Sequence, residues 1–313
     1  MKKYLMAIAT LLMGASIAAT AQRYEKVQYG DFESWTVRNI KESAVLGGET
    51  RKLYVVGPSQ TIDGNKTFSY NNTIWAGSNA YAKVAGITKV SVSVTPDNGP
   101  SGKCAKLQTR MAECKVAGVV DISVLAQGSL FWGKILEPIT GTSNPYSFMD
   151  WGIPFTKRPS AVVLDYKALV PNTGEIIKGG KAVKGSDAEQ IYLILQHRYE
   201  DENGVIHAKR VGTAFLRISK TTSGWVKDAR IPVIYGDATK SPKYKAYMNL
   251  MGAKLYAINS KGKKKKVIED EWGDESTPVT HAIMSITSGS AGTFAGALDN
   301  TLWVDNIRLE YDK

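Results

Sequence analysis

Apolar and polar side chains alternate with a period of two along much of the chain from residue 89 onward. In residues 89–94 three valines alternate with Lys and Ser, and in residues 189–199 three large aliphatic side chains occupy every second position. A period of two is that of a half-buried β-strand, whose successive side chains point to opposite faces. The pattern therefore predicts a chain built from short strands.

Two segments combine strands and a turn into predicted hairpins. The turn Asp201-Glu202-Asn203-Gly204 joins residues 189–199 to residues 205–218, and Gly204 can adopt positive φ without steric cost. The Lys-rich loop 261–266 joins two further alternating runs. Residues 242–252 carry Tyr and Met at three- and four-residue spacings, which indicates one short helix or an ordered loop.

No fixed-period repeat and no long linker interrupts these strands. We therefore predict an all-β fold in which residues 22–313 form one antiparallel β-sandwich domain with at most one short helix. An N-terminal subdomain, residues 22–98, is the main alternative.

The first 21 residues have the order of a secretory signal peptide. Lys2 and Lys3 precede an uncharged apolar run, and Ala19-Thr20-Ala21 offers small side chains for cleavage before Gln22. No Cys follows the apolar run, so a lipid anchor is not expected, and the run is short for a membrane span. We expect an exported chain, periplasmic or on the cell surface, soluble after cleavage and without an integral membrane segment.

The net charge of the chain limits the classes of partner that we expect. The formal net charge is +11, and loss of Lys2 and Lys3 with the signal peptide lowers it to +9. A basic exported protein favours an acidic partner such as a glycan, and nucleic acid is not expected. The run Lys263–Lys266 is followed at once by Glu269, Asp270 and Glu271, as in a solvated hairpin tip.

The two cysteines leave a question open. Cys104 and Cys114 are ten residues apart, a spacing that suits a disulfide across a hairpin in an oxidising compartment. Two free buried thiols fit the pattern equally well. The three histidines are scattered without the spacing of metal ligands.

The alternation of apolar and polar side chains changes phase within the C-terminal strand. Leu302 and Val304 occupy even positions whereas Ile307 and Leu309 occupy odd ones, so one residue near Asp305 must be accommodated outside the regular pleat. A β-bulge there would return both apolar sets to the core and redirect Asp305. A carboxylate placed this way needs a partner, either Ca²⁺ or a nearby Lys or Arg.

Three stretches resemble the putative carbohydrate metabolism domain family of exported Bacteroidetes proteins. They are Gly30–Trp35 with the sequence GDFESW, the region from SGKCAKLQT through WGIPFTKRP to Lys167, and the region from Trp225 to Tyr311 that ends in TLWVDNIRLEY. The resemblance implies a jelly-roll-like β-sandwich and a role in carbohydrate recognition or utilisation. Asp31, Glu33 and Asp305 also resemble the structural calcium set that many sugar-binding sandwiches hold between their chain ends.

Sugar binding needs aromatic rings that stack on a pyranose face beside polar groups that bond hydroxyls. Residues 144–151 read as an aromatic-bearing loop, and loops on a rigid sandwich commonly carry binding groups. We predict a carbohydrate site around Tyr146, Trp151, Arg158 and Asp165. Trp132, Phe148, Trp225 and Trp272 are further available rings.

Two other functions compete with binding. A glycoside hydrolase would need two carboxylates facing each other across a cleft, and candidates are Glu137, Asp150, Asp165 and Asp228, although no motif selects a pair. No nucleophile elbow, phosphate loop or HExxH helix is present. A structural or adhesive subunit of a surface assembly is the third possibility, indicated by an unpaired edge strand near either terminus.

Overall fold

Strands form nearly all of the regular structure. The computed structural model describes residues 23–312, so the predicted signal peptide lies outside the described residues. Within that range the only helices are four short 3₁₀ turns, of which η4 falls in the segment where one short helix was predicted: η1 (Ala44–Leu46), η2 (Pro145–Phe148), η3 (Ala238–Lys240) and η4 (Ala246–Met248).

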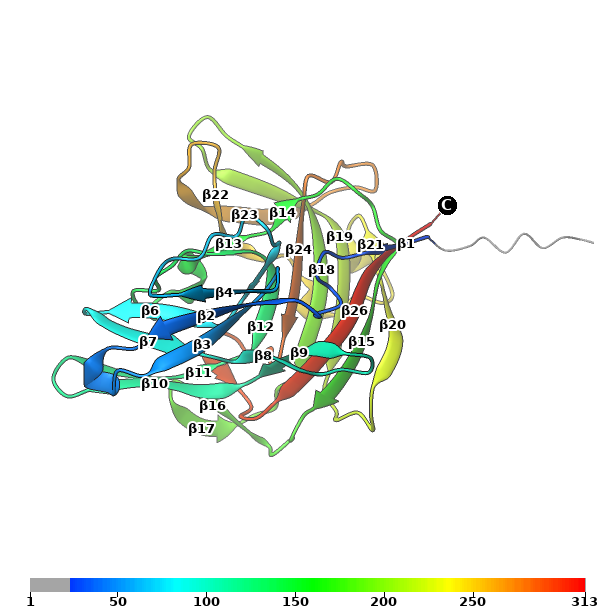
Figure 1. Cartoon of the computed structure of the whole chain (residues 1–313). Helices are drawn as coiled ribbons and strands as arrows, with labels where there is room; N and C mark the ends of the chain where they lie inside the picture. Colours follow the sequence, from blue (N-terminus) through cyan, green and yellow to red (C-terminus); the bar gives the residue numbers. More distant parts are fainter. Residues whose placement is uncertain (1–22, 313) are drawn as a thin grey trace, which may run out of the picture.

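One face of the molecule is a six-stranded antiparallel sheet. Its order is β20-β15-β26-β9-β8, with β1 also paired to β26. Its strands are β1 (Arg23–Lys26), β8 (Val94–Asn98), β9 (Lys103–Gln108), β15 (Ala161–Leu169), β20 (Val226–Pro232) and β26 (Thr301–Tyr311). Because β26 pairs with β15 on one side and with β9 and β1 on the other, the C-terminal strand lies inside the sheet (Figure 1).

The opposing sheet has ten strands. Its main path is β13-β12-β24-β18-β19-β23-β22, and β14, β21 and β5 pair at its sides. Its strands are β5 (Trp75–Gly77), β12 (Ser129–Ile135), β13 (Met149–Trp151), β14 (Ile153–Pro154), β18 (Glu189–Glu200), β19 (Ile206–Ile218), β21 (Ile234–Tyr235), β22 (Gly252–Ile258), β23 (Lys264–Trp272) and β24 (His281–Thr287). Both predicted hairpins, β18–β19 and β22–β23, are confirmed.

Four small sheets complete the chain. They are β3-β2-β4, β6-β7, β10-β11 and β17-β16-β25, and Figure 1 shows the β6–β7 and β10–β11 hairpins projecting away from the sandwich. Their strands are β2 (Trp35–Lys41), β3 (Thr50–Val56), β4 (Gln60–Asp63), β6 (Ala80–Val84), β7 (Ile87–Ser91), β10 (Arg110–Val116), β11 (Val120–Ala126), β16 (Glu175–Lys178), β17 (Lys181–Lys184) and β25 (Ala295–Gly296).

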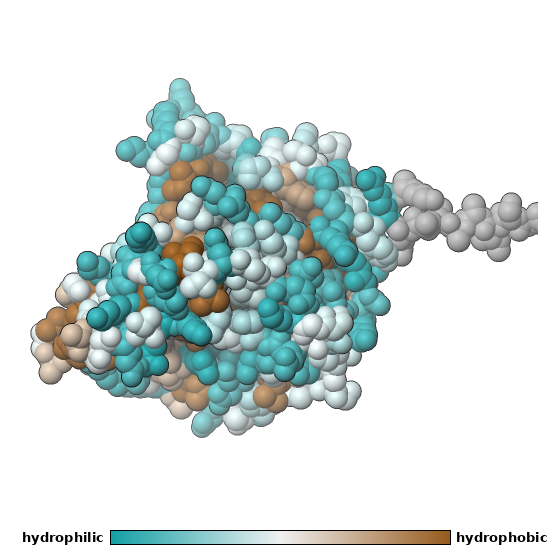
Figure 2. Space-filling view, in the orientation of Figure 1, coloured by the Kyte–Doolittle hydropathy of each residue, from teal (hydrophilic) through white to brown (hydrophobic). Residues whose placement is uncertain are grey.

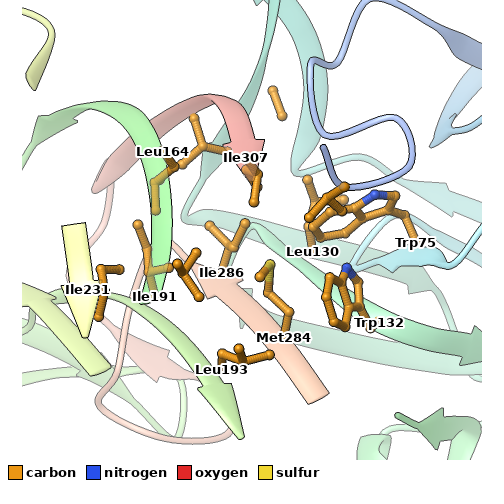
Figure 3. Close-up of a cluster of buried hydrophobic side chains, with 14 of the residues drawn as sticks. Trp75, Leu130, Trp132, Leu164, Ile191, Leu193, Ile231, Met284, Ile286 and Ile307 are labelled. Carbon is orange, nitrogen blue, oxygen red and sulfur yellow. The ribbon is translucent and has the colours of Figure 1, made fainter. Parts of the chain in front are cut away.

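The main core lies between the two large sheets. Alternate side chains of β15 and β26, such as Leu164 and Ile307, meet those of β18 and β24, such as Ile191 and Met284 (Figure 3). This confirms the all-β sandwich. The antiparallel prediction needs one correction, because β2 pairs with β4 and β19 pairs with β23 in parallel.

A second core covers the other face of the ten-stranded sheet. Tyr192 and Ile194 of β18 point into it, and Met248 of η4 packs there as well. Because both faces of β18 are covered, residues 191–196 are all buried. The strand was predicted to be half-buried, but it is buried on both faces, because Tyr192 and Ile194 between the alternating aliphatic residues pack into the second core.

The alternating run 89–94 does not form the one strand that its period predicted. It is split between β7, which pairs with β6, and β8, which pairs with β9 in the six-stranded sheet. The side-chain oxygen of Asn79 accepts hydrogen bonds from the backbone amides of Ser93 and Val94, both at 2.9 Å. A side chain therefore replaces a strand partner where the chain crosses between sheets.

The predicted bulge in the C-terminal strand is confirmed. The register between β15 and β26 shifts so that Val163 faces Arg308 but Asp165 faces Asp305. Asn306 adopts φ +54° at the extra position.

The two cysteines are free and buried, Cys104 in β9 of the six-stranded sheet and Cys114 in β10 of a separate hairpin. Among residues 23–312, no helix has the length and apolar character needed to cross a membrane.

Candidate functional site

The described part of the chain contains a groove of about 850 Å³. Its lining comes from the projecting hairpins β6–β7 and β10–β11, from η2 and the adjoining ends of β12 and β13, and from residues 292–294. The β6–β7 hairpin turns tightly because Ala85 and Gly86 have φ of +48° and +80°, as in a two-residue hairpin loop.

Aromatic rings line the groove. Tyr54 of β3 and Tyr146 and Phe148 of η2 are half-buried there. Pro145 begins η2, where its fixed φ suits a first helical position, and Leu136 donates a 2.7 Å backbone bond to Phe148. This turn holds the Tyr146 and Phe148 rings at the wall of the groove.

Four cations also line the groove, Arg51, Lys52, Lys89 and Arg110. The buried carboxylate of Glu42 lies behind two of them, 3.2 Å from the Lys89 ammonium and 3.7 Å from the Arg51 guanidinium. Glu42 also accepts a 2.9 Å bond from the Val90 amide, so its position is fixed by the backbone of β7.

Glu113 is the single carboxylate among the described lining residues. It lies 3.1 Å from the Lys115 ammonium and accepts a 3.0 Å bond from Ser123. The hydrogen bond from Lys115 is the largest cause that lowers the pKa of Glu113, so this side chain is ionised at neutral pH. The groove has no second carboxylate in the described lining to form an acid and base pair.

The structure brings two of the four predicted sugar-binding residues together. Tyr146 lines the groove, and its ring centroid lies 6.2 Å from that of Trp151. Trp151 itself is 5% exposed and packs on Phe131 at 4.3 Å, so it supports the wall from behind.

Arg158 and Asp165 lie elsewhere. The Arg158 guanidinium donates to the carbonyl oxygens of Thr277 and Glu275 and covers the ring of Tyr235 at 4.2 Å. Asp165 belongs to β15 in the opposite sheet, where it accepts a 2.8 Å bond from the Asp228 amide and faces Asp305. The four residues therefore do not form one site.

The predicted calcium residues do share a neighbourhood. Burial raises the pKa of Asp305 to about 7, and the negative charges of Asp165, Glu33 and Asp31 add to this effect. Asp305 is 1% exposed, and its Oδ2 atom has no hydrogen-bond partner. Glu33 is held differently, by a 2.9 Å bond from the Lys103 amide.

These carboxylates do not form a complete metal site by themselves. No group of three or more His, Cys, Asp and Glu side chains within residues 23–312 is arranged to hold a metal ion. A cation at Asp305 would need backbone oxygens or water to complete its coordination.

Comparison with known proteins identifies the family. The sequence profile described as "Putative carbohydrate metabolism domain" matches residues 50–310. The chain belongs to this carbohydrate metabolism domain family. The family match covers the ten-stranded sheet, the six-stranded sheet except β1 and the last residue of β26, and the groove, and no curated protein matches the chain significantly.

A solved structure with the same kind of fold is similar to this chain. A putative glycoside hydrolase from Bacteroides thetaiotaomicron is 24% identical, with 89% of this chain and 71% of that chain covered and a TM-score of 0.51. A putative glycoside hydrolase from Bacteroides vulgatus is 16% identical, with 93% and 96% covered and a TM-score of 0.47.

Several groove residues of this carbohydrate metabolism domain could not be predicted from the sequence. Tyr54, Arg51 and Arg110 carry no local motif, and they meet only because β3 and β10 approach the same hollow. The aromatic-bearing loop was the one usable signal, because a ring-rich segment beside a proline is visible without the tertiary structure.

Proposed function

We propose that this chain is an exported carbohydrate-binding protein that holds a glycan in the groove between η2 and the projecting hairpins. The observation that carries the proposal is the concave surface with half-buried tyrosine and phenylalanine rings beside exposed cations, in a chain of the carbohydrate metabolism domain family. Concave sites with a few placed polar groups are the usual form of a small-ligand site.

Tyr146 is the residue to test first. We expect Tyr146→Ala to weaken glycan binding by about five- to thirtyfold, because a stacked ring contributes on the order of 1–2 kcal/mol. Binding is measured by titration calorimetry against a ligand selected on a glycan array. Tyr199→Ala is the matched control, since Tyr199 is 46% exposed and lies outside the groove. Equal affinity of Tyr146→Ala and the wild type would refute the location.

The charge of the groove favours an acidic glycan. Lys52 and Arg110 are exposed at the rim, and no carboxylate in the described residues forms an ion pair with either. We expect a uronic-acid oligosaccharide to bind more tightly than its neutral counterpart, and the difference to shrink in Lys52→Gln and Arg110→Gln and at high salt. Equal affinity for both sugars would contradict the acidic preference but leave the groove in place.

Hydrolysis is the second candidate. With Glu113 as the single described carboxylate of the lining, binding without turnover is the expected result. Reducing-end assays on the bound glycan test this. Product release that survives Glu113→Gln would require a pair of carboxylates that does not include Glu113. The third possibility, an assembly subunit, keeps a structural cue at one end: β26 is paired on both sides, but β1 pairs with β26 alone among the described strands.

We propose a calcium site at Asp305 because the Oδ2 atom of this buried carboxylate has no hydrogen-bond partner. Asp31 and Glu33 lie close enough for their negative charges to raise the pKa of Asp305. We expect calcium to raise the melting temperature of the wild type, and Asp305→Asn to lose that part of the shift. Unchanged melting on chelation would remove this site.

A further inference from the structure

Three buried oxygen atoms lack a hydrogen-bond partner where β18 and β26 begin. They are both carboxylate oxygens of Glu189 and the Oδ1 atom of Asn300. Each of the two side chains belongs to a residue that is 0% exposed. An unsatisfied buried polar group is costly and calls for an explanation such as an ion or a water.

Asp187 joins these atoms into one cluster. Its Oδ2 atom accepts a 3.4 Å bond from the Asn300 amide nitrogen, which leaves the Asn300 oxygen directed elsewhere. Reversing the amide would bring two acceptors together, so the contact with Asp187 sets its orientation. Glu189 lies two residues from Asp187. The backbone amide of Thr301 lowers the pKa of the Glu189 carboxyl, but it does not reach hydrogen-bond geometry with either carboxylate oxygen.

No positive side chain in the described residues forms an ion pair with Asp187 or Glu189. The charge of Arg217 reaches Asp187, yet its Nε atom donates to Gln190 at 2.9 Å. Asp187 is itself satisfied by the amides of Ser290 and Ala297, at 2.8 and 3.1 Å. Burial, followed by the Asp187 charge, raises the pKa of Glu189 to about 9, so without a cation this side chain is protonated at neutral pH.

We propose that a hard divalent cation, Ca²⁺, binds between the Glu189 carboxylate and the Asn300 amide oxygen, with Asp187 holding Asn300 in the binding orientation. Carboxylate and amide oxygens are the donors that Ca²⁺ prefers, and its flexible coordination accepts further backbone or water oxygens. The cation would satisfy all three orphaned oxygens at once.

The site would also stabilise one rim of the groove. Asp187 holds both ends of the segment 290–297, and residues 292–294 of that segment line the groove. Gln127 adds a 2.6 Å bond to the Ala295 carbonyl. This consequence rests on the proposed glycan function: calcium would raise glycan affinity by ordering the rim.

The test measures the metal first, without a glycan. We expect the wild-type chain, titrated with CaCl₂ alone after chelation, to bind calcium, and its melting temperature to rise by about 4 °C or more when calcium is in large excess. Glu189→Gln should lose this binding step, whereas Asp305→Asn should keep it.

The outcomes separate the proposals. The site would be overturned if Glu189→Gln bound calcium as the wild type does. It would also be overturned if the calcium binding of the wild type disappeared entirely in Asp305→Asn. So would a chain that binds no calcium and melts at the same temperature with and without chelator, which would mean that Glu189 is simply protonated. A chain that binds calcium through Glu189 but no glycan would support the site and refute only the glycan proposal.

Discussion

His281, at the start of β24, shows how burial of one side chain sets a pH dependence. Burial lowers the pKa of His281 to about 4, and the positive charge of Arg198 acts in the same direction. The pKa of His in an unfolded chain is about 6.5, so between about pH 6.5 and pH 4 the unfolded state binds more protons. The stability that His281 contributes is therefore complete above pH 6.5 and is lost as the pH falls.

A substitution isolates that contribution from the carboxylates, which also titrate in acid. We expect His281→Asn to lose less free energy of unfolding between pH 7 and pH 4.5 than the wild type does. Urea denaturation at both pH values provides the measurement. An equal loss in both proteins would mean that His281 does not resist protonation.

The bulge residue Asn306 combines backbone strain with a side-chain bond. It adopts φ +54° and donates a 3.0 Å bond to the Asp165 carboxylate. We expect Asn306→Val to lower the free energy of unfolding by about 2 kcal/mol, because a β-branched residue is strained at positive φ and the bond is lost. Asn306→Gly loses the bond without the strain and should cost less, and equal losses would contradict the strain argument.

At the scale of the elements, a buried ion pair accompanies the parallel pairing of β19 and β23. Arg210 and Glu269 are both 0% exposed, and the guanidinium makes two bonds of 2.7 and 2.6 Å to the carboxylate. Gln196 and the Met251 amide also donate to Glu269. The pair is thus fully satisfied, as a buried pair must be.

Removing one partner of that pair should be severe. We expect Glu269→Gln to lower the free energy of unfolding by about 3–5 kcal/mol, because Arg210 would stay buried without a counter-charge. Glu271→Gln, on the same strand but exposed, should change stability little. Chemical denaturation compares the two, and a small loss in Glu269→Gln would indicate that water reaches Arg210.

At the scale of the whole molecule, the first part of the chain contributes to the shared core. Phe32, Trp35 and Trp75 belong to the same buried cluster as the two large sheets, and the Trp75 and Trp132 rings lie 6.0 Å apart. We expect one cooperative unfolding transition, with fluorescence and near-ultraviolet circular dichroism coinciding. Two separated transitions would instead support an independent subdomain over residues 22–98.

The pattern of apolar and polar residues predicted a structural feature correctly where the cause of that feature lies within the same segment. A period of two reflects the pleat itself, so the hairpins β18–β19 and β22–β23 were predictable. The phase change near Asp305 predicted the bulge, because a strand must return its apolar side chains to the core. The split of residues 89–94 was not predictable, because it depends on Asn79, a residue outside the run.

The sequence by itself thus determined the all-β class and the family. The tertiary structure alone decided which segments meet. It placed Trp151 behind the groove wall, separated Arg158 and Asp165 from Tyr146, and gathered Asp187, Glu189 and Asn300 into one buried cluster. The reason is that periodicity records which side of a strand is buried, whereas a site depends on strand order and register, which bring together residues far apart in the chain.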